Sequence, residues 1–278
     1  MPYMRKISLA ALLVVAGSGM AFADSGSVSL GYGQINTNNV DINTTTLSGT
    51  FEKNFANGLT VNAIGRHSGS NGAVAVEVTN AFVDLTYGFQ SGTYIGGYLQ
   101  RTLIMGSALN AYGFILGYKV GATELSAFYG ETDISNGTTD DWGLAASYEA
   151  PNWAAHASHQ VMDSDSVDPK ATGIAGGYMF KSNISVFAAY ASFDNFNDLS
   201  SGSIGASYAF NNTFSGVPIV ASAEYMNIDT DYATSEKLSF MLTMQFGNEP
   251  GIIPDQSFAG SVANPGYSSN ASFFDGIY

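Results

Sequence analysis

Apolar residues alternate with small or polar ones along almost the whole chain, and this alternation limits the fold more than any other feature. The clearest example is KLSFMLTMQFG at 237–247, in which every second side chain from Leu238 to Phe246 is apolar. An extended strand projects alternate side chains to opposite faces, so such a segment has one apolar face. Comparable segments lie at 28–32, 47–51, 59–63, 81–89, 95–99, 112–118, 125–129, 142–148, 153–157, 174–180, 184–190, 204–210 and 219–225. Helix-period runs of similar length do not occur, so we predict an all-β chain of about fourteen strands, with twelve or sixteen as alternatives.

The connections between these segments alternate between short and long. Short ones with turn residues lie at 55–58, 90–92, 119–122, 149–152 and 181–183. Longer polar ones lie at 67–77, 131–141, 160–172, 193–201 and 227–236. This order predicts an up-and-down antiparallel meander with short turns at one end and longer loops at the other.

The number of strands indicates which face of the expected barrel is apolar. Fourteen strands enclose more space than their side chains fill, because about eight strands is the size that packs solid. The large apolar face should therefore point outward to membrane lipid, where only helices and closed barrels pair every backbone group. Aromatic residues where strands meet the short turns predict an interfacial girdle. These residues are Tyr87, Phe89, Tyr118, Tyr148, Trp153, Phe180, Phe210 and Phe246.

The two ends of the chain differ from the strand pattern. Arg5 and Lys6, an apolar run to Val15 and the triplet Ala21-Phe22-Ala23 predict a signal peptide at 1–23, cleaved before Asp24. The barrel should then occupy 24–246. A tail rich in Gly, Pro, Ser and Asn follows at 247–278 and should leave on the periplasmic side. It is disordered, docks on a partner or returns to the lumen as a plug; we favour disorder and rank the plug last.

Four segments resemble strands of Gram-negative porins, those of alphaproteobacteria in particular. They are GYGQI at 31–35, AYGFILGYKV at 111–120, GIAGGYMF at 173–180 and GSIGASYAF at 202–210. The resemblance covers about residues 24–246. It implies an integral protein of the Gram-negative outer membrane, in contact with lipid and lipopolysaccharide, through which small hydrophilic solutes and ions diffuse. The resemblance does not decide whether the chain forms a homo-oligomer, such as a trimer. Unlike the long acidic third loop of general porins, the connection at 102–110 is short and uncharged.

The strand face opposite the apolar one should line the lumen. Our candidate pore-lining residues there are Arg66, Asp84, Gln100, His156, Glu224 and Lys237. Acidic residues of the longer loops should attract cations, which predicts a modest cation preference. They are Asp133, Asp140, Asp141, Asp163, Asp165, Asp168, Asp229 and Asp231. Large apolar residues interrupt the lumen face, either as a track for a less polar solute or because a β-bulge exchanges the faces. These are Phe82, Ile115, Phe128, Met179, Phe187 and Met241.

Other classes of function find less support. With 9 basic against 23 acidic residues, the chain is not expected to bind nucleic acid. Without cysteine it can form no disulfide or thiolate metal site, and we expect no metal, cofactor or enzymatic activity. Of its three histidines, His67, His156 and His159, the last two differ in strand parity and cannot share one site. A passive channel is favoured. The alternative is a non-conducting structural or adhesive barrel, which a plugged or filled lumen would favour.

Overall fold

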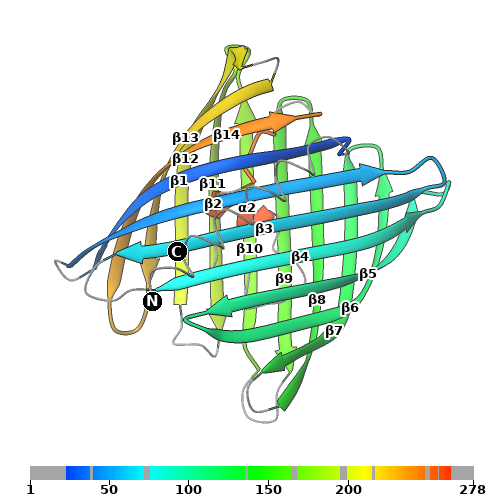
Figure 1. Cartoon of the computed structure of the whole chain (residues 1–278), viewed down its shortest axis with the longest axis horizontal. Helices are drawn as coiled ribbons and strands as arrows, with labels where there is room; N and C mark the ends of the chain where they lie inside the picture. Colours follow the sequence, from blue (N-terminus) through cyan, green and yellow to red (C-terminus); the bar gives the residue numbers. More distant parts are fainter. Residues whose placement is uncertain are drawn as a thin grey trace, which may run out of the picture.

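The chain forms a closed barrel of fourteen antiparallel strands in this computed structural model (Figure 1). The structure describes residues 23–37, 40–71, 76–134, 137–163, 168–194, 199–214, 217–247, 251–255 and 257–263. Residues 1–22 of the predicted signal peptide therefore lie outside the described part. The first seven strands are β1 (Ser25–Thr37), β2 (Val40–Asn54), β3 (Leu59–Asn71), β4 (Glu77–Gly88), β5 (Thr93–Ile104), β6 (Ser107–Val120) and β7 (Thr123–Ile134). The others are β8 (Gly137–Ala150), β9 (Trp153–Asp163), β10 (Lys170–Met179), β11 (Ile184–Asp194), β12 (Leu199–Phe214), β13 (Val217–Asp229) and β14 (Thr234–Phe246).

Each strand pairs with its neighbours in sequence, and β1 pairs with β14 to close the ring. The closing register runs from Gly26 opposite Phe246 to Thr37 opposite Ser235. A closed ring leaves no strand edge without a hydrogen-bonding partner. The predicted all-β, up-and-down barrel and its count of fourteen are thus confirmed.

The outer surface carries the apolar faces that the alternation predicts. Leu30, Leu99, Phe114, Ile204 and Leu242 are all more than half exposed, between 56% and 76%. Their neighbours along each strand point inward and are buried or half-buried. In β11, buried and outward residues alternate through nearly the whole strand. This is the inverse of a water-soluble protein, in which large apolar side chains gather inside.

The connections are shorter than predicted. The end with the proposed longer loops has connections of two to six residues, because the strands continue into the polar segments. For example, β7 runs to Ile134 and β8 begins at Gly137 in the predicted loop 131–141. Polar residues pair in a β-ladder as well as apolar ones, but they leave no alternating pattern in the sequence.

Tight turns at both ends use left-handed backbone conformations. The two-residue turn between β5 and β6 has Met105 at φ 50° and Gly106 at φ 87°, as a type I′ hairpin requires.

At the start of β1, Asp24 accepts hydrogen bonds from the Lys53 ammonium at 2.6 Å and the Asn54 amide at 2.8 Å. The hydrogen bond from Lys53, with that from Asn54, lowers the pKa of the Asp24 carboxyl.

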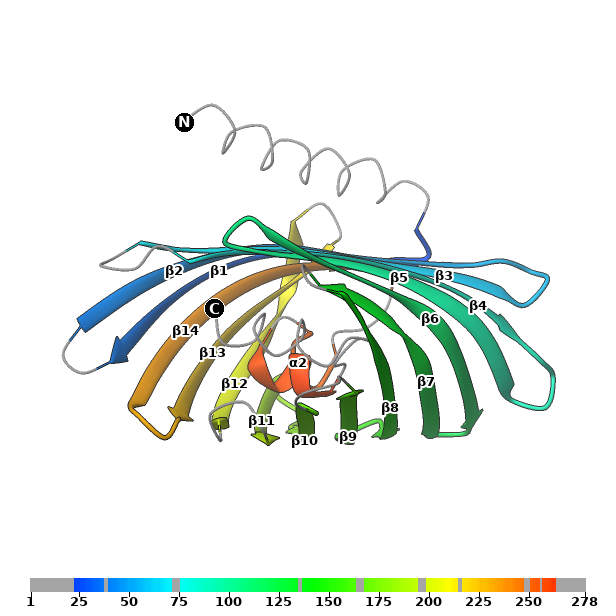
Figure 2. The same ribbon diagram turned by 90° about the horizontal axis from the view of Figure 1, so that it is seen from below.

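The chain returns into the barrel after β14. We use "C-terminal segment" for its described residues, 251–255 and 257–263, which include the short helix α2 (Phe258–Ala263). Figure 2 shows α2 inside the barrel, where it contacts β9, β10, β11 and β12. Among the described residues, no helix has the length and apolar character to cross a membrane.

Candidate functional site

All six candidate pore-lining residues point into the barrel. Five of them have less than 8% of their surface exposed. These five are Arg66, Asp84, Gln100, Glu224 and Lys237. The His156 side chain is 10% exposed. Burial of this degree would not occur on the wall of an empty, water-filled tube, so other groups must cover them.

Inward-facing aromatic and aliphatic residues fill one part of the lumen. The cluster joins β4 to β7 and contains Phe82, Tyr98, Ala111, Ile115 and Phe128. Tyr98 meets Phe128 edge to face, with ring centroids 6.0 Å apart. Gly143 on β8 leaves the room that Phe128 needs, because a Cβ there would lie 2.3 Å from the ring. The apolar residues that interrupt the predicted lumen face therefore do point inward, and no bulge has exchanged the faces there.

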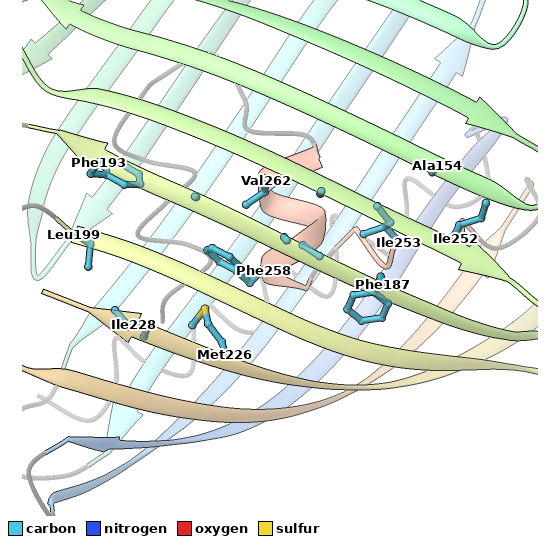
Figure 3. Close-up of a cluster of buried hydrophobic side chains, with 14 residues drawn as sticks. Ala154, Phe187, Phe193, Leu199, Met226, Ile228, Ile252, Ile253, Phe258 and Val262 are labelled. Atoms are coloured by element: carbon cyan, nitrogen blue, oxygen red, sulfur yellow. The ribbon is translucent and has the colours of Figure 1, made fainter.

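The C-terminal segment fills a second part of the lumen. Ile252, Ile253, Phe258, Ala259 and Val262 of this segment are buried. They pack against inward-facing side chains of the barrel wall (Figure 3). The wall residues of this cluster are Ala154, Ala175, Phe187, Ala189, Ala191, Phe193, Leu199, Met226 and Ile228. The favoured expectation of a disordered periplasmic tail does not hold for these described residues, because their apolar side chains are buried in the lumen and removed from water.

Polar contacts fix the orientation of the C-terminal segment. The Glu224 carboxylate on β13 accepts hydrogen bonds from the backbone amides of Phe258, at 2.8 Å, and Ala259, at 3.1 Å. Arg66 on β3 donates to the Ser261 hydroxyl from the other wall at 3.4 Å. Ser257 is the N-cap residue that precedes α2, and its hydroxyl accepts a hydrogen bond from the Gly260 amide at 2.9 Å.

The charged residues around this contact leave little free space. Arg66, Glu224 and Lys237 line a cavity of only about 20 Å³, which Phe258 also borders. Lys237 lies within electrostatic range of both Arg66 and Glu224. Arg66 and Glu224 therefore hold the C-terminal segment, and Lys237 lies beside them at the same small cavity rather than at an open passage.

A cavity of about 660 Å³ remains between the C-terminal segment and the walls of β5, β7, β8 and β9. Three carboxylates line it, Glu124, Glu149 and Asp255, together with His156; none of its lining residues is Lys or Arg. The Tyr94 hydroxyl donates to Glu124 at 2.7 Å, and the Lys119 ammonium lies 3.2 Å from the same carboxylate. His156 lies 3.8 Å from Glu149. Of the six candidate pore residues, only His156 borders this cavity.

The candidate loop acids are spread over different environments. Asp133, Asp140, Asp163 and Asp229 lie on strands with outward parity, and Asp141 points inward, fully buried, where it accepts a hydrogen bond from Thr132. Asp168 and Asp231 lie in connections, and Asp165 lies outside the described residues. Most of these acids are therefore strand residues, so they do not form one acidic ring of loops.

The sequence did not identify Glu124, Glu149 and Asp255 as a group of acids around one cavity. Glu149 lies at the end of β8 and faces inward, which strand parity predicts once β8 is extended to Ala150. Asp255 has no such signal, because the C-terminal segment carries no strand pattern that would place it in the lumen.

The three histidines lie on both faces of the barrel wall. His67 and His159 face outward and contact Thr79 and Thr172 at 2.8 and 2.9 Å, so His156 and His159 lie on opposite faces as predicted. Ser147 lies opposite His156 in the β8–β9 ladder. Within the described part of the chain, however, no hydrogen bond joins Ser147 to His156, as an activated nucleophile requires. No group of three or more His, Asp or Glu among the described residues is placed to hold a metal ion.

Comparison with known proteins places the fold among outer-membrane porins. The outer membrane protein Omp33 of Acinetobacter baumannii superposes with a TM-score of 0.55 at 12% identity, over 80% of this chain and 98% of that one. OmpF of Salmonella typhi, in a complex with daunomycin, gives a TM-score of 0.52 at 13% identity, over 80% and 96%. No family model matches the sequence, and no curated protein matches it either. The likeness is thus one of fold: a closed porin-type barrel.

Proposed function

We propose that this chain is an outer-membrane channel through which small hydrophilic solutes and ions diffuse passively. The observation that carries this proposal is the cavity of about 660 Å³ inside a closed barrel with an apolar exterior. An aqueous space enclosed by a barrel offers a path for solutes across an otherwise apolar layer.

The exterior and the strand lengths support insertion into a membrane. The strands are 10 to 16 residues long. A tilted strand needs about 9–11 residues to cross the hydrocarbon core, so every strand is long enough. Export through the predicted signal peptide at 1–23 would deliver the barrel to the outer membrane. The sequence resemblance does not decide whether the chain forms a homo-oligomer, such as a trimer.

Cation preference is supported by the charges around the remaining cavity. Glu149 and Asp255 lie within electrostatic range of one another at its border. Glu124 contributes less, because Lys119 pairs with it. Carboxylates beside a narrow passage raise the local concentration of cations and lower that of anions.

The second candidate function is a non-conducting barrel that acts through its exposed rim. The observation in its favour is the filling of the lumen by the aromatic cluster and by the C-terminal segment. The two functions differ in one property, which is whether ions pass through the barrel.

The test is electrical. Residues 24–278 are refolded, folding is verified by heat-dependent migration in gel electrophoresis, and the protein is inserted into planar bilayers. We expect stepwise conductance and a reversal potential of the cation-selective sign under asymmetric salt. Folded barrels that pass no current would refute the channel and favour the non-conducting barrel.

A further inference from the structure

The inner wall under the C-terminal segment is shaped to receive it. The buried wall side chains that share its apolar cluster on β9 to β11 include Ala154, Ala175, Ala189 and Ala191. β10 adds two glycines that face the segment at close range. A Cβ on Gly173 would lie 2.7 Å from Val262, and one on Gly177 would lie 2.8 Å from Ile252. Larger side chains here would displace the segment, so this part of the wall is a fitted seat rather than a general pore lining.

The C-terminal segment is held in this seat without strand pairing. None of its described residues belongs to a β-strand. Its links to the wall include apolar packing, the two amide hydrogen bonds to Glu224 and the hydrogen bond from Arg66 to Ser261. Contacts between side chains can separate while all fourteen strand pairs stay intact, so the segment can leave the seat without unfolding the barrel.

We propose that the C-terminal segment is a displaceable plug, with Glu224 as its latch, and that its position sets the conductance. In the seated state the solute path is restricted to the cavity beside Glu149 and Asp255. In the released state the seat on β9 to β12 joins this path and widens it. Release exposes apolar wall residues such as Phe187 and Met226 to water, so the seated state is the more populated one. The inference rests on the proposed channel only for its electrical readout.

The absence of cysteine from the chain allows a reversible lock. In the double variant Gly173→Cys/Val262→Cys, the sulfur at 262 would take the place of the Val262 Cγ1, which lies 2.7 Å from the position of a Cβ on residue 173. That proximity is compatible with a disulfide. We expect the oxidised protein to stay at one low conductance level and the reduced protein to regain transitions to a higher level. The unchanged chain and Val262→Cys alone, treated in the same way, are the controls.

A second readout does not depend on current. Ala259 is fully buried, so Ala259→Cys should react slowly with a bulky, membrane-impermeant maleimide. Adding Phe258→Ala should speed the reaction at least about tenfold, because truncating a buried aromatic costs more than the 1.4 kcal/mol that a factor of ten requires. Phe55→Ala, at an exposed turn residue, is the matched control and should leave the rate unchanged.

The outcomes separate the plug from the channel. Equal conductance in the oxidised, reduced and Phe258→Ala proteins would overturn the plug and leave the channel standing. Rapid labelling of Ala259→Cys in the otherwise unchanged chain, or failure of the cysteine pair to oxidise, would also overturn the plug. Slow labelling that Phe258→Ala accelerates, in barrels that never conduct, would support the seated segment and refute the channel.

Discussion

Neutralising Glu149 and Asp255 is expected to reduce the cation preference of the proposed channel. One carboxylate comes from the barrel wall at the end of β8, and the other comes from the C-terminal segment. Both border the open cavity, and no lysine or arginine does. The substitutions Glu149→Gln and Asp255→Asn remove the charge while they keep the size of each side chain.

The size of the effect follows from the size of the cavity. A sphere of 660 Å³ has a radius of about 5.4 Å, which we take as the distance from a wall carboxylate to a passing ion. At that distance two unit charges in water interact with about 0.8 kcal/mol. A Debye length of about 8 Å reduces this to about 0.4 kcal/mol at physiological salt. Each carboxylate then about doubles the local cation concentration and halves that of anions, so its removal lowers the permeability ratio about fourfold.

Reversal potentials in planar bilayers measure this ratio. At about 0.15 M salt, each single variant should lower the cation-to-anion permeability ratio about fourfold, and the double variant should lower it about fifteenfold. Glu131→Gln is the matched control, because it makes the same charge change on β7 but on the outer face, where Glu131 accepts a hydrogen bond from Tyr112. An unchanged reversal potential in the double variant, with channels that still conduct, would refute the passage of ions through the cavity beside Glu149 and Asp255.

Three further predictions concern the exterior, the latch and the start of β1. Leu242→Lys on the outer face should destabilise the folded barrel by about 2–4 kcal/mol, the cost of a lysine that faces lipid near the bilayer midplane. Denaturant unfolding in lipid vesicles measures this loss. Thr243→Lys, whose side chain has the opposite parity, is the comparison. Glu224→Gln should raise the labelling rate of Ala259→Cys about 5- to 30-fold, since a charge-assisted hydrogen bond is worth about 1–2 kcal/mol more than a neutral one, and an unchanged rate would remove Glu224 as the latch. Because Lys53 holds the pKa of Asp24 below its usual value, their contact should stabilise the barrel above the ordinary carboxyl pKa and lose that effect as the pH falls through the lowered one. Thermal unfolding of Asp24→Asn should lack this acid-dependent part, and a pH profile identical to that of the unchanged protein would contradict it.

The barrel wall was predictable because its signal is local. An outward side chain such as Leu242 needs only an apolar surrounding, and strand parity alone assigns it to the outer face. The same parity correctly turns Arg66, Glu224 and Lys237 inward. The lengths of the connections were not predictable, because strands such as β7 continue through polar residues that carry no alternation.

The contents of the lumen were beyond the sequence, because they depend on contacts between distant residues. Glu224 and Phe258 are 34 positions apart, and Arg66 and Ser261 are 195 apart. Parity states that Arg66 faces inward, but it does not state whether water or a protein segment meets it there. The glycines of β10 likewise look like ordinary porin-strand glycines until Val262 is placed against Gly173.

The sequence by itself determined a closed β-barrel with an apolar exterior, because an alternation of period two is a property of each strand alone. Only the tertiary structure decided which inward residues border open space and which are covered. That outcome depends on ring closure, on the register between strands and on the return of the C-terminal segment, whose apolar side chains are removed from water only when a wall formed from residues far away in the chain receives them.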